Sequence, residues 1–159
     1  MTAAELVALL TARGQTLGCA ESLTGGLLTD AIVQVPGASR VLMGGIVAYD
    51  EGRKQTLLGV SAQALVRYTA VSAQVACEMA LGARRVLAVD YAVSTTGYAG
   101  PDGGEDGTPV GTIHIGICFQ GKAQVRTICS PRGRENARRD AANHALDMIL
   151  RAAKKGANG

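Results

Sequence analysis

The sequence predicts an α/β protein, a single three-layer α/β/α sandwich with a mixed sheet, and three observations support this fold class. Apolar strand-like segments alternate with amphipathic helical segments over the first two-thirds of the chain. Two more strand-like segments and a long helix follow, which favours a mixed sheet over a parallel one. A length of 159 residues with 47% hydrophobic composition suits one core. We therefore expect one domain at 1–155 and a disordered tail at 156–159.

Hydrophobic periodicity and capping signals place the individual elements. Ser, Thr and Asp residues suited to helix N-caps precede several helical patterns, and glycines follow several of them. The strand segments show a continuous apolar run or a strict alternation of apolar and polar residues. The expected helices are 2–13, 27–35, 51–58, a short one after Ser61, 73–84 and 135–155. The expected strands are 16–20, 45–49, 86–95, 112–119 and 123–129.

A long loop is expected at 97–111, which holds six glycines and two prolines. Loops of this length in a compact domain are usually functional or disordered, and strands flank this one at both ends. We interpret it as a site loop.

The four cysteines are scattered without a C-x-x-C pair, which excludes a zinc knuckle and a thioredoxin-like motif. With a turn at 120–122, Cys118 would face Gln124 and Cys129 would face Ile113, so the two would not be cross-strand partners. We expect reduced thiols, no metal site and no cofactor.

The net charge of +3 is unevenly distributed, because 122–155 holds nine Lys or Arg against three Asp or Glu. A solvated helix face explains this best, and an anionic ligand is the alternative. No Trp, one Phe and four Tyr leave few platforms for stacking bases, which argues against a nucleic-acid partner. Without a long apolar run or a basic leader, we expect a cytoplasmic protein that does not contact a membrane.

The stretch 20–26 joins a strand to a helix and is the leading candidate for a functional site. Such a turn directs backbone N–H groups and the helix dipole at one position, where Ser22 would lie beside an oxyanion site. A Ser before a helix is more often an N-cap than a nucleophile. Thr24 can take the capping role and leave Ser22 free, with N–H groups from Thr24 to Gly26 holding the oxyanion.

A nucleophilic serine needs a base, and the two histidines lie mid-strand and mid-helix, where a core or surface role is favoured. Lys54 is the better candidate, because it follows Tyr49 by five residues just past a strand end. Its pKa must fall before it can act near neutrality. From this segment alone a solvated lysine on a short helix is favoured over a base, and Tyr49 is either a proton relay or an interfacial aromatic.

Four arginines gather at the expected start of the last helix, where the dipole disfavours cations. Their position suggests a purpose other than helix stability. Arg134 and Arg138 are four residues apart and can share a helix face around one phosphate.

Several motifs occur together in a specific order that covers nearly the whole chain. They are Glu21–Gly26, Tyr49 with Lys54, Ala70–Ser72, Gly97–Gly104, Pro109–Thr112 and Arg134 with Arg138. In this combination the chain resembles the CinA carboxy-terminal domain family, the nicotinamide-nucleotide amidases.

The resemblance implies an amidase that hydrolyses nicotinamide mononucleotide to nicotinate mononucleotide and ammonia, without metal or cofactor, and that self-associates, with a dimer favoured. By motif match, Ser22 is the nucleophile, Lys54 its general base and Tyr49 an assisting hydroxyl. The residues expected to bind substrate are Thr24, Gly25, Gly26, Thr96, Gly97, Arg134 and Arg138, the last suited to the phosphate.

The chain departs from the family pattern at three positions. Leu23 replaces a common Cys, Thr108 a Lys, and Glu51 an Asn. A carboxylate near Lys54 would raise its pKa, the wrong direction for a base. A catalytically silent domain that binds a nucleotide or a partner is therefore the alternative, and a nucleic-acid accessory protein is a third, weaker hypothesis.

Overall fold

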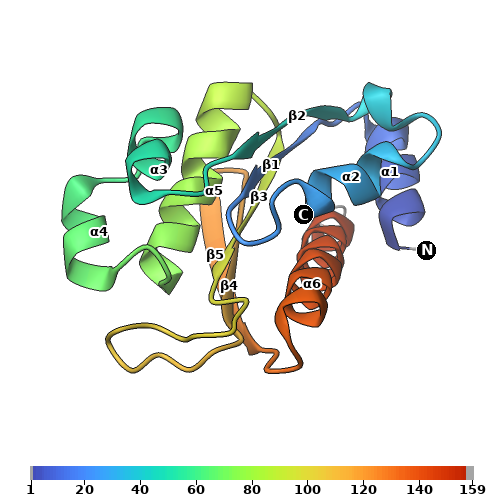
Figure 1. The fold of residues 1–159 in the computed structure, drawn as a ribbon. Coiled ribbons are helices and arrows are strands. Elements are labelled where there is room, and N and C mark those ends of the chain that lie inside the picture. The colour runs from blue at the N-terminus through green and yellow to red at the C-terminus, as the bar shows by residue number, and fades with distance from the viewer. Residues whose placement is uncertain (1, 157–159) are drawn as a thin grey trace.

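A five-stranded mixed sheet forms the centre of the protein, whose computed structural model describes residues 2–156 (Figure 1). The strand order is β2-β1-β3-β4-β5, in which β1 pairs in parallel with β2 and β3, and β4 is antiparallel to both neighbours. The strands are β1 (Leu17–Glu21), β2 (Leu42–Val47), β3 (Tyr91–Gly97), β4 (Thr112–Phe119) and β5 (Lys122–Cys129). The mixed sheet confirms the predicted fold class.

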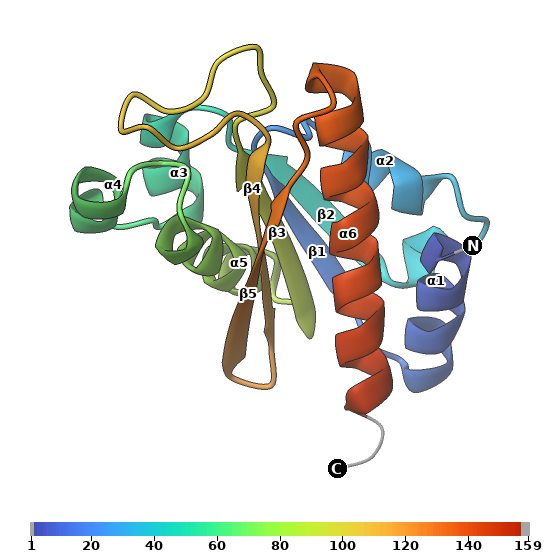
Figure 2. The same cartoon turned by 90° about the horizontal axis from the view of Figure 1, so that it is seen from below.

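One face of the sheet is covered by three helices, which Figure 2 shows beside the strands. They are α1 (Thr2–Arg13), α2 (Leu27–Val33) and α6 (Arg134–Lys155), and a 3-10 turn, η1 (Ala38–Arg40), leads into β2. Their apolar faces meet inward-facing strand residues in the larger core, which includes Leu6, Leu10, Leu17, Ile115 and Ile149. Burial of these side chains is the main force that holds this layer to the sheet.

The opposite face carries α3 (Glu51–Leu58), α4 (Ala62–Tyr68) and α5 (Ala73–Leu87). Asp50, Ser61 and Ser72 cap these three helices through their side chains, as the sequence predicted for Ser61 and Ser72. The smaller core here includes Leu58, Met79 and Ala92. The two helical layers together give the predicted α/β/α sandwich.

Two strand predictions are wrong in their limits. Val86 and Leu87 belong to α5, because Leu87 packs above the bare backbone of Gly18 and Gly44. The helix ends at Ala88 with a φ of 52°, and β3 starts only at Tyr91. β2 starts earlier than predicted and ends at Val47, so Tyr49 lies beyond the strand.

The hairpin between β4 and β5 turns in two residues, Gln120 and Gly121, which have φ values of 50° and 70°. This tight turn moves the register by one residue from the prediction, and Cys118 faces Ala123 while Cys129 faces Thr112. The prediction that the two cysteines are not cross-strand partners is confirmed. All four cysteines are free thiols.

The chain changes direction at β1, which lies between β2 and β3 in the sheet. It reaches β2 by way of α2 on one face, then crosses to β3 by way of α3 to α5 on the other face. In open α/β sheets, ligands bind beyond the carboxyl ends of parallel strands at such a switch point. Ser22 directly follows β1 and therefore occupies the expected position for a site.

The last helix ends at Lys155, with Gly156 as its C-cap, and 157–159 of the predicted tail lie outside the described residues. Within residues 2–156, none of the helices has the length and apolar character that crossing a membrane requires.

Candidate active site

Ser22 and Lys54 meet directly beyond the ends of β1 and β2. Lys54 Nζ donates to Ser22 Oγ over 2.9 Å and to the carbonyl oxygens of Ala48 and Tyr49 over 3.0 and 2.9 Å. The lysine is only 1% exposed, although it belongs to the first turn of a surface helix. The alternative of a solvated lysine is therefore wrong. These contacts give the arrangement of a serine nucleophile beside an amine base.

Burial lowers the pKa of Lys54 to about 8, because the interior disfavours the charged ammonium. The carboxylates of Asp50 and Glu51 act in the opposite direction and raise this pKa. The direction expected for Glu51 is therefore confirmed, but burial is the larger effect. A pKa of about 8 leaves a useful fraction of neutral amine near pH 7 to 8, which a general base requires.

Ser22 does not cap α2, and neither does Thr24. The N-cap of α2 is Gly26, and the side chain of Glu21 accepts the N–H groups of Gly26, Leu28 and Thr29. Thr24 instead shares a 2.8 Å hydrogen bond with Thr95 and is fully buried. The capping role predicted for Thr24 is wrong, because the carboxylate of Glu21 accepts the N–H groups at the start of α2.

The glycines of this turn do not offer the free donors that were expected. Gly25 donates its N–H to the carbonyl of Ser22, and Gly26 donates to Glu21 Oε1. Both have positive φ values, 57° and 105°, which explains why glycine is needed here. The N–H groups of Leu23 and Thr24 donate to no acceptor among residues 2–156. Thr24 is fully buried, so of these two only the N–H of Leu23 is a donor that an oxyanion beside Ser22 can use.

A pocket of about 230 Å³ opens above the serine and the lysine. Its lining includes two cations and, among residues 2–156, no carboxylate. The residues that line it are Ser22, Leu23, Tyr49, Lys54, Ala70, Val71, Thr96, Gly97, Tyr98, Ala99 and Arg134. Six predicted site residues are thus brought together, and the start of the glycine-rich loop borders the pocket as predicted.

Some lining residues were missed from the sequence, and some predicted residues lie elsewhere. Ala70 and Val71 line the pocket, although the sequence assigned no role to their motif, Ala70–Ser72. The carbonyl of Ala70 accepts a 2.8 Å hydrogen bond from the Thr96 hydroxyl. Thr24, Gly25, Gly26 and Arg138 do not line the pocket formed by the described residues. His114 bonds Thr127 on the neighbouring strand, in keeping with a structural role.

The guanidinium groups of Arg134 and Arg138 contact different segments instead of meeting around one position. Arg134 donates to the carbonyl of Gly100 over 2.6 Å and to the hydroxyl of Tyr49 over 3.2 Å. Arg138 donates through Nε to Leu23 O over 2.9 Å and through Nη2 to Thr24 O over 3.0 Å. Arg134 therefore lies at the pocket, while Arg138 holds the serine turn.

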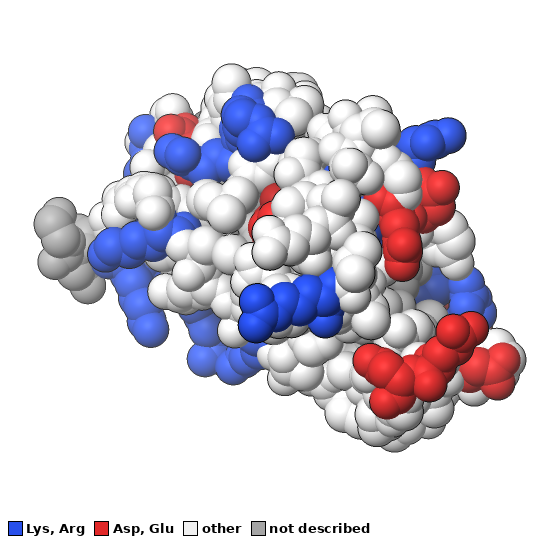
Figure 3. All heavy atoms as spheres, turned by 90° about the vertical axis from the view of Figure 1, so that its left-hand side faces the viewer, with Lys and Arg blue, Asp and Glu red and all other residues white. Residues whose placement is uncertain are grey.

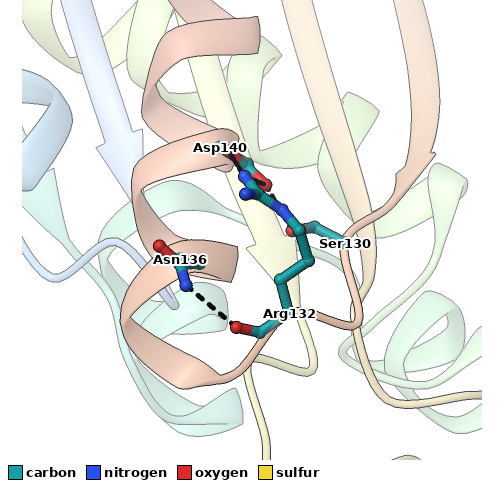
Figure 4. A network of polar contacts seen from close by, with 4 residues as sticks. All are labelled: Ser130, Arg132, Asn136 and Asp140. Carbon is teal, nitrogen blue, oxygen red and sulfur yellow. Dashed lines mark hydrogen bonds and ion pairs between the residues drawn. The ribbon is translucent and has the colours of Figure 1, made fainter.

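A polar network fixes the start of α6, from which Arg134 projects (Figure 4). Asp140 accepts hydrogen bonds from the Ser130 hydroxyl and from Arg132, while Asn136 donates to Arg132 O over 3.0 Å. These donors lower the pKa of Asp140, the Ser130 hydroxyl most. The network ties the end of β5 to α6 and limits the movement of Arg134.

Charged side chains are distributed unevenly around the molecule, and acidic ones gather along one edge of the face in Figure 3. The glycine-rich loop contributes the exposed Asp102, Glu105 and Asp106. Within the described part of the chain, no group of three or more His, Cys, Asp or Glu residues could hold a metal ion. The side chains of the pocket that carry hydroxyl groups or charge are those of Ser22, Tyr49, Lys54, Thr96, Tyr98 and Arg134.

Comparison with known proteins identifies the family. A sequence model described as the CinA C-terminal domain matches residues 1–153. The chain belongs to the CinA C-terminal domain family. A CinA-like protein from Synechococcus sp. is 48% identical over 149 residues, which cover 91% of this chain and 35% of that protein. This CinA domain thus spans about a third of the length of the curated relatives it matches.

Solved structures agree with this membership. A CinA superfamily protein from Klebsiella pneumoniae 700603 superimposes with a TM-score of 0.94 at 30% identity, covering 97% of this chain and 96% of that one. A CinA superfamily protein from Escherichia coli gives 0.92 at 36% identity, covering 94% and 87%. The sandwich is therefore the fold of these CinA proteins.

Proposed function

We propose that this CinA domain is an amidohydrolase that converts nicotinamide mononucleotide to nicotinate mononucleotide and ammonia. The observation that carries the proposal is the 2.9 Å contact between Ser22 Oγ and the buried Nζ of Lys54, whose pKa is lowered to about 8. A neutral lysine can remove the serine proton near physiological pH, which an exposed lysine cannot do efficiently.

The reaction follows in two stages. Ser22 Oγ attacks the carboxamide carbon while Lys54 takes the hydroxyl proton, and the N–H group of Leu23 binds the oxyanion. Lys54 then returns the proton to the departing nitrogen, which leaves as ammonia. A water molecule then attacks the acyl-serine ester while Lys54 takes its proton, and Lys54 passes this proton to Ser22 Oγ as the carboxylic acid is released. No step uses a metal or a cofactor.

The pocket supports a small amide attached to a larger anionic group. Its volume of about 230 Å³ lies below the usual range for a whole drug-sized ligand, so it encloses the reacting end of the substrate. Arg134 is exposed beside Tyr49 and provides a donor for a phosphate outside the enclosed part. Tyr49 assists through its hydroxyl. Nucleic acid and membranes are not partners in this proposal.

Ammonia release from nicotinamide mononucleotide tests the proposal directly. We expect turnover by the purified protein, and its loss in Ser22→Ala and in Lys54→Met with secondary structure retained. Full activity in Ser22→Ala would exclude this mechanism. We also propose that the protein is cytoplasmic and forms a homo-oligomer. Light scattering of the same preparation tests the oligomeric state, for which a dimer is expected.

A second candidate function is a silent domain that binds the nucleotide without turnover. Asp50 and Glu51 favour it, because both carboxylates raise the pKa of Lys54 and thus stabilise the inactive ammonium. Calorimetry would then show binding of the mononucleotide while no ammonia forms. Turnover by the pure protein would eliminate this candidate.

A further inference from the structure

The turn that carries Ser22 is held by two charged side chains of opposite sign, Glu21 and Arg138. From their contacts we infer that both are positioning residues, which fix the peptide groups of the turn so that the N–H group of Leu23 is aligned for the oxyanion. This inference rests on the proposed function. It gives Arg138 a different role from the phosphate contact that the family resemblance implies.

Glu21 secures the end of the turn that joins α2. Its carboxylate is fully buried and accepts the N–H groups of Gly26, Leu28 and Thr29 and the Thr29 hydroxyl, at 3.2, 2.9, 3.0 and 2.5 Å. A buried carboxylate is stable only with such donors, so its geometry is well determined. The carboxylate also occupies the N-terminus of α2, which is therefore closed to a substrate anion.

Arg138 secures the other side of the turn through carbonyl oxygens. Its Nε and Nη2 donate to Leu23 O and Thr24 O, and the fixed fork of a guanidinium suits two neighbouring carbonyls. In a planar trans peptide the C=O and the following N–H point in opposite directions. By holding Thr24 O, Arg138 therefore fixes the peptide plane that carries the N–H of Gly25.

The peptide plane that carries the N–H of Leu23 is fixed in the same manner. The carbonyl of Ser22 accepts the N–H of Gly25 over 3.1 Å, so the N–H of Leu23 points away from Gly25. Leu23 lines the pocket, whereas Arg138 does not line it. Both unused N–H groups thus belong to peptide planes whose carbonyls are held by partners within the turn or on α6.

Kinetics of Arg138→Lys and Glu21→Gln test the role. Arg138→Lys keeps the charge but cannot reproduce the two-pronged contact, and Glu21→Gln keeps the size but replaces one accepting oxygen with an NH2 group. For both, kcat for nicotinamide mononucleotide should fall by about 10- to 100-fold while KM changes by less than about threefold. The calorimetric Kd of nicotinate mononucleotide should stay near the wild-type value. Arg139→Lys and Glu135→Gln alter an exposed pair on the same helix and should change neither constant.

Two readouts distinguish positioning of the turn by Arg138 from direct binding of the phosphate. The pH at the midpoint of the acidic limb of kcat/KM should be unchanged in Arg138→Lys, because Arg138 does not contact Lys54. If Arg138 binds the phosphate instead, KM and the product Kd rise at least about tenfold while kcat is retained, which overturns the inference.

Hydrogen exchange keeps the test independent of the substrate. Arg138→Lys should speed exchange of the backbone amides of 22–26 and leave those of α5 protected. Unchanged exchange at 22–26 would contradict the positioning role of Arg138. If the wild-type protein releases no ammonia, the proposed function fails and the exchange result alone decides the positioning role. If Glu21→Gln does not fold, the Arg138→Lys variant alone tests the positioning role.

Discussion

At the residue scale, the chemistry depends on the balance of charge around Lys54. Three oxygen acceptors around its Nζ favour the ammonium, and so do the carboxylates of Asp50 and Glu51. Burial opposes them and prevails, with a resulting pKa of about 8. In the proposed mechanism, the same lysine can therefore accept the serine proton to begin the reaction and donate it to the leaving group.

The pH dependence of kcat/KM should show this pKa. The neutral amine is the active form, so kcat/KM should rise about tenfold per pH unit below pH 8 and level off above it. Initial rates of ammonia release between pH 5.5 and 9.5, in buffers of constant ionic strength, measure the curve. A profile that is flat from pH 6 to 9 would exclude Lys54 as the base.

Replacing Glu51 should improve the base near neutrality. The carboxylate raises the pKa of Lys54, so Glu51→Gln should lower that pKa and move the acidic limb to lower pH. Because Glu51 is exposed and screened by solvent, we expect a gain on the order of twofold in kcat/KM at pH 7. Glu105→Gln, which changes an exposed loop carboxylate, is the matched control. A shift of the acidic limb of kcat/KM to higher pH in Glu51→Gln would contradict the effect of Glu51 on the pKa of Lys54.

At the element scale, the position of Lys54 depends on the packing of α3 against α5. Leu58 at the end of α3 lies so close to Gly82 of α5 that a Cβ at this glycine would be 1.8 Å from Leu58 O. Glycine is therefore required for close approach of the helices and not for a special backbone angle. Any side chain at this position would push away the helix that carries the base.

Gly82→Ala tests this dependence. The alanine improves helix propensity by about 1 kcal/mol, but the clash with backbone should prevail and lower the free energy of unfolding by about 1–3 kcal/mol. The displacement of α3 should also reduce kcat. Urea unfolding and ammonia release measure both effects, with Leu81→Ala at an exposed neighbour as the control. Higher stability with full activity would show that the two helices separate at little cost.

Most elements could be predicted from the sequence, because caps and periodicity are local signals. The run at Val86–Leu87 was assigned to a strand, since apolar β-branched sequence alone does not show that Leu87 packs over two glycines. The pairing of Ser22 with Lys54 followed from the family resemblance, whereas the segment around Lys54 alone favoured a solvated lysine. Glu21 as a helix cap and Arg138 as a clamp could not be predicted, because both roles depend on side-chain directions that the three-dimensional fold determines.

At the scale of the whole molecule, the site is assembled from distant parts of the chain. Ser22 follows β1, Lys54 follows β2, Thr96 lies in β3, and Arg134 begins α6. The strands meet at the carboxyl edge of the sheet, where the chain reverses its crossover direction. No single element holds enough of the site to act alone.

Activity should therefore be lost together with global structure. We expect ammonia release and far-ultraviolet circular dichroism to give the same urea midpoint, since the groups of the site separate only when the sheet and α6 separate. Loss of activity at clearly lower urea would show that the site edge opens by itself. Wild-type and Arg139→Lys proteins should behave alike in this measurement.

The contacts of α6 also determine when the molecule can begin to work. Arg138 holds the turn at Leu23, 115 residues earlier in the chain, and Arg134 reaches Tyr49, 85 residues earlier. All five strands, together with Ser22 and Lys54, precede α6 in the chain and are synthesised before it. A chain that ends before α6 has neither arginine. The turn that carries Ser22 then lacks its contacts with Arg138, and the pocket lacks Arg134. If the domain is the proposed amidase, we therefore expect a nascent chain to release no ammonia until its final helix has been translated and has docked.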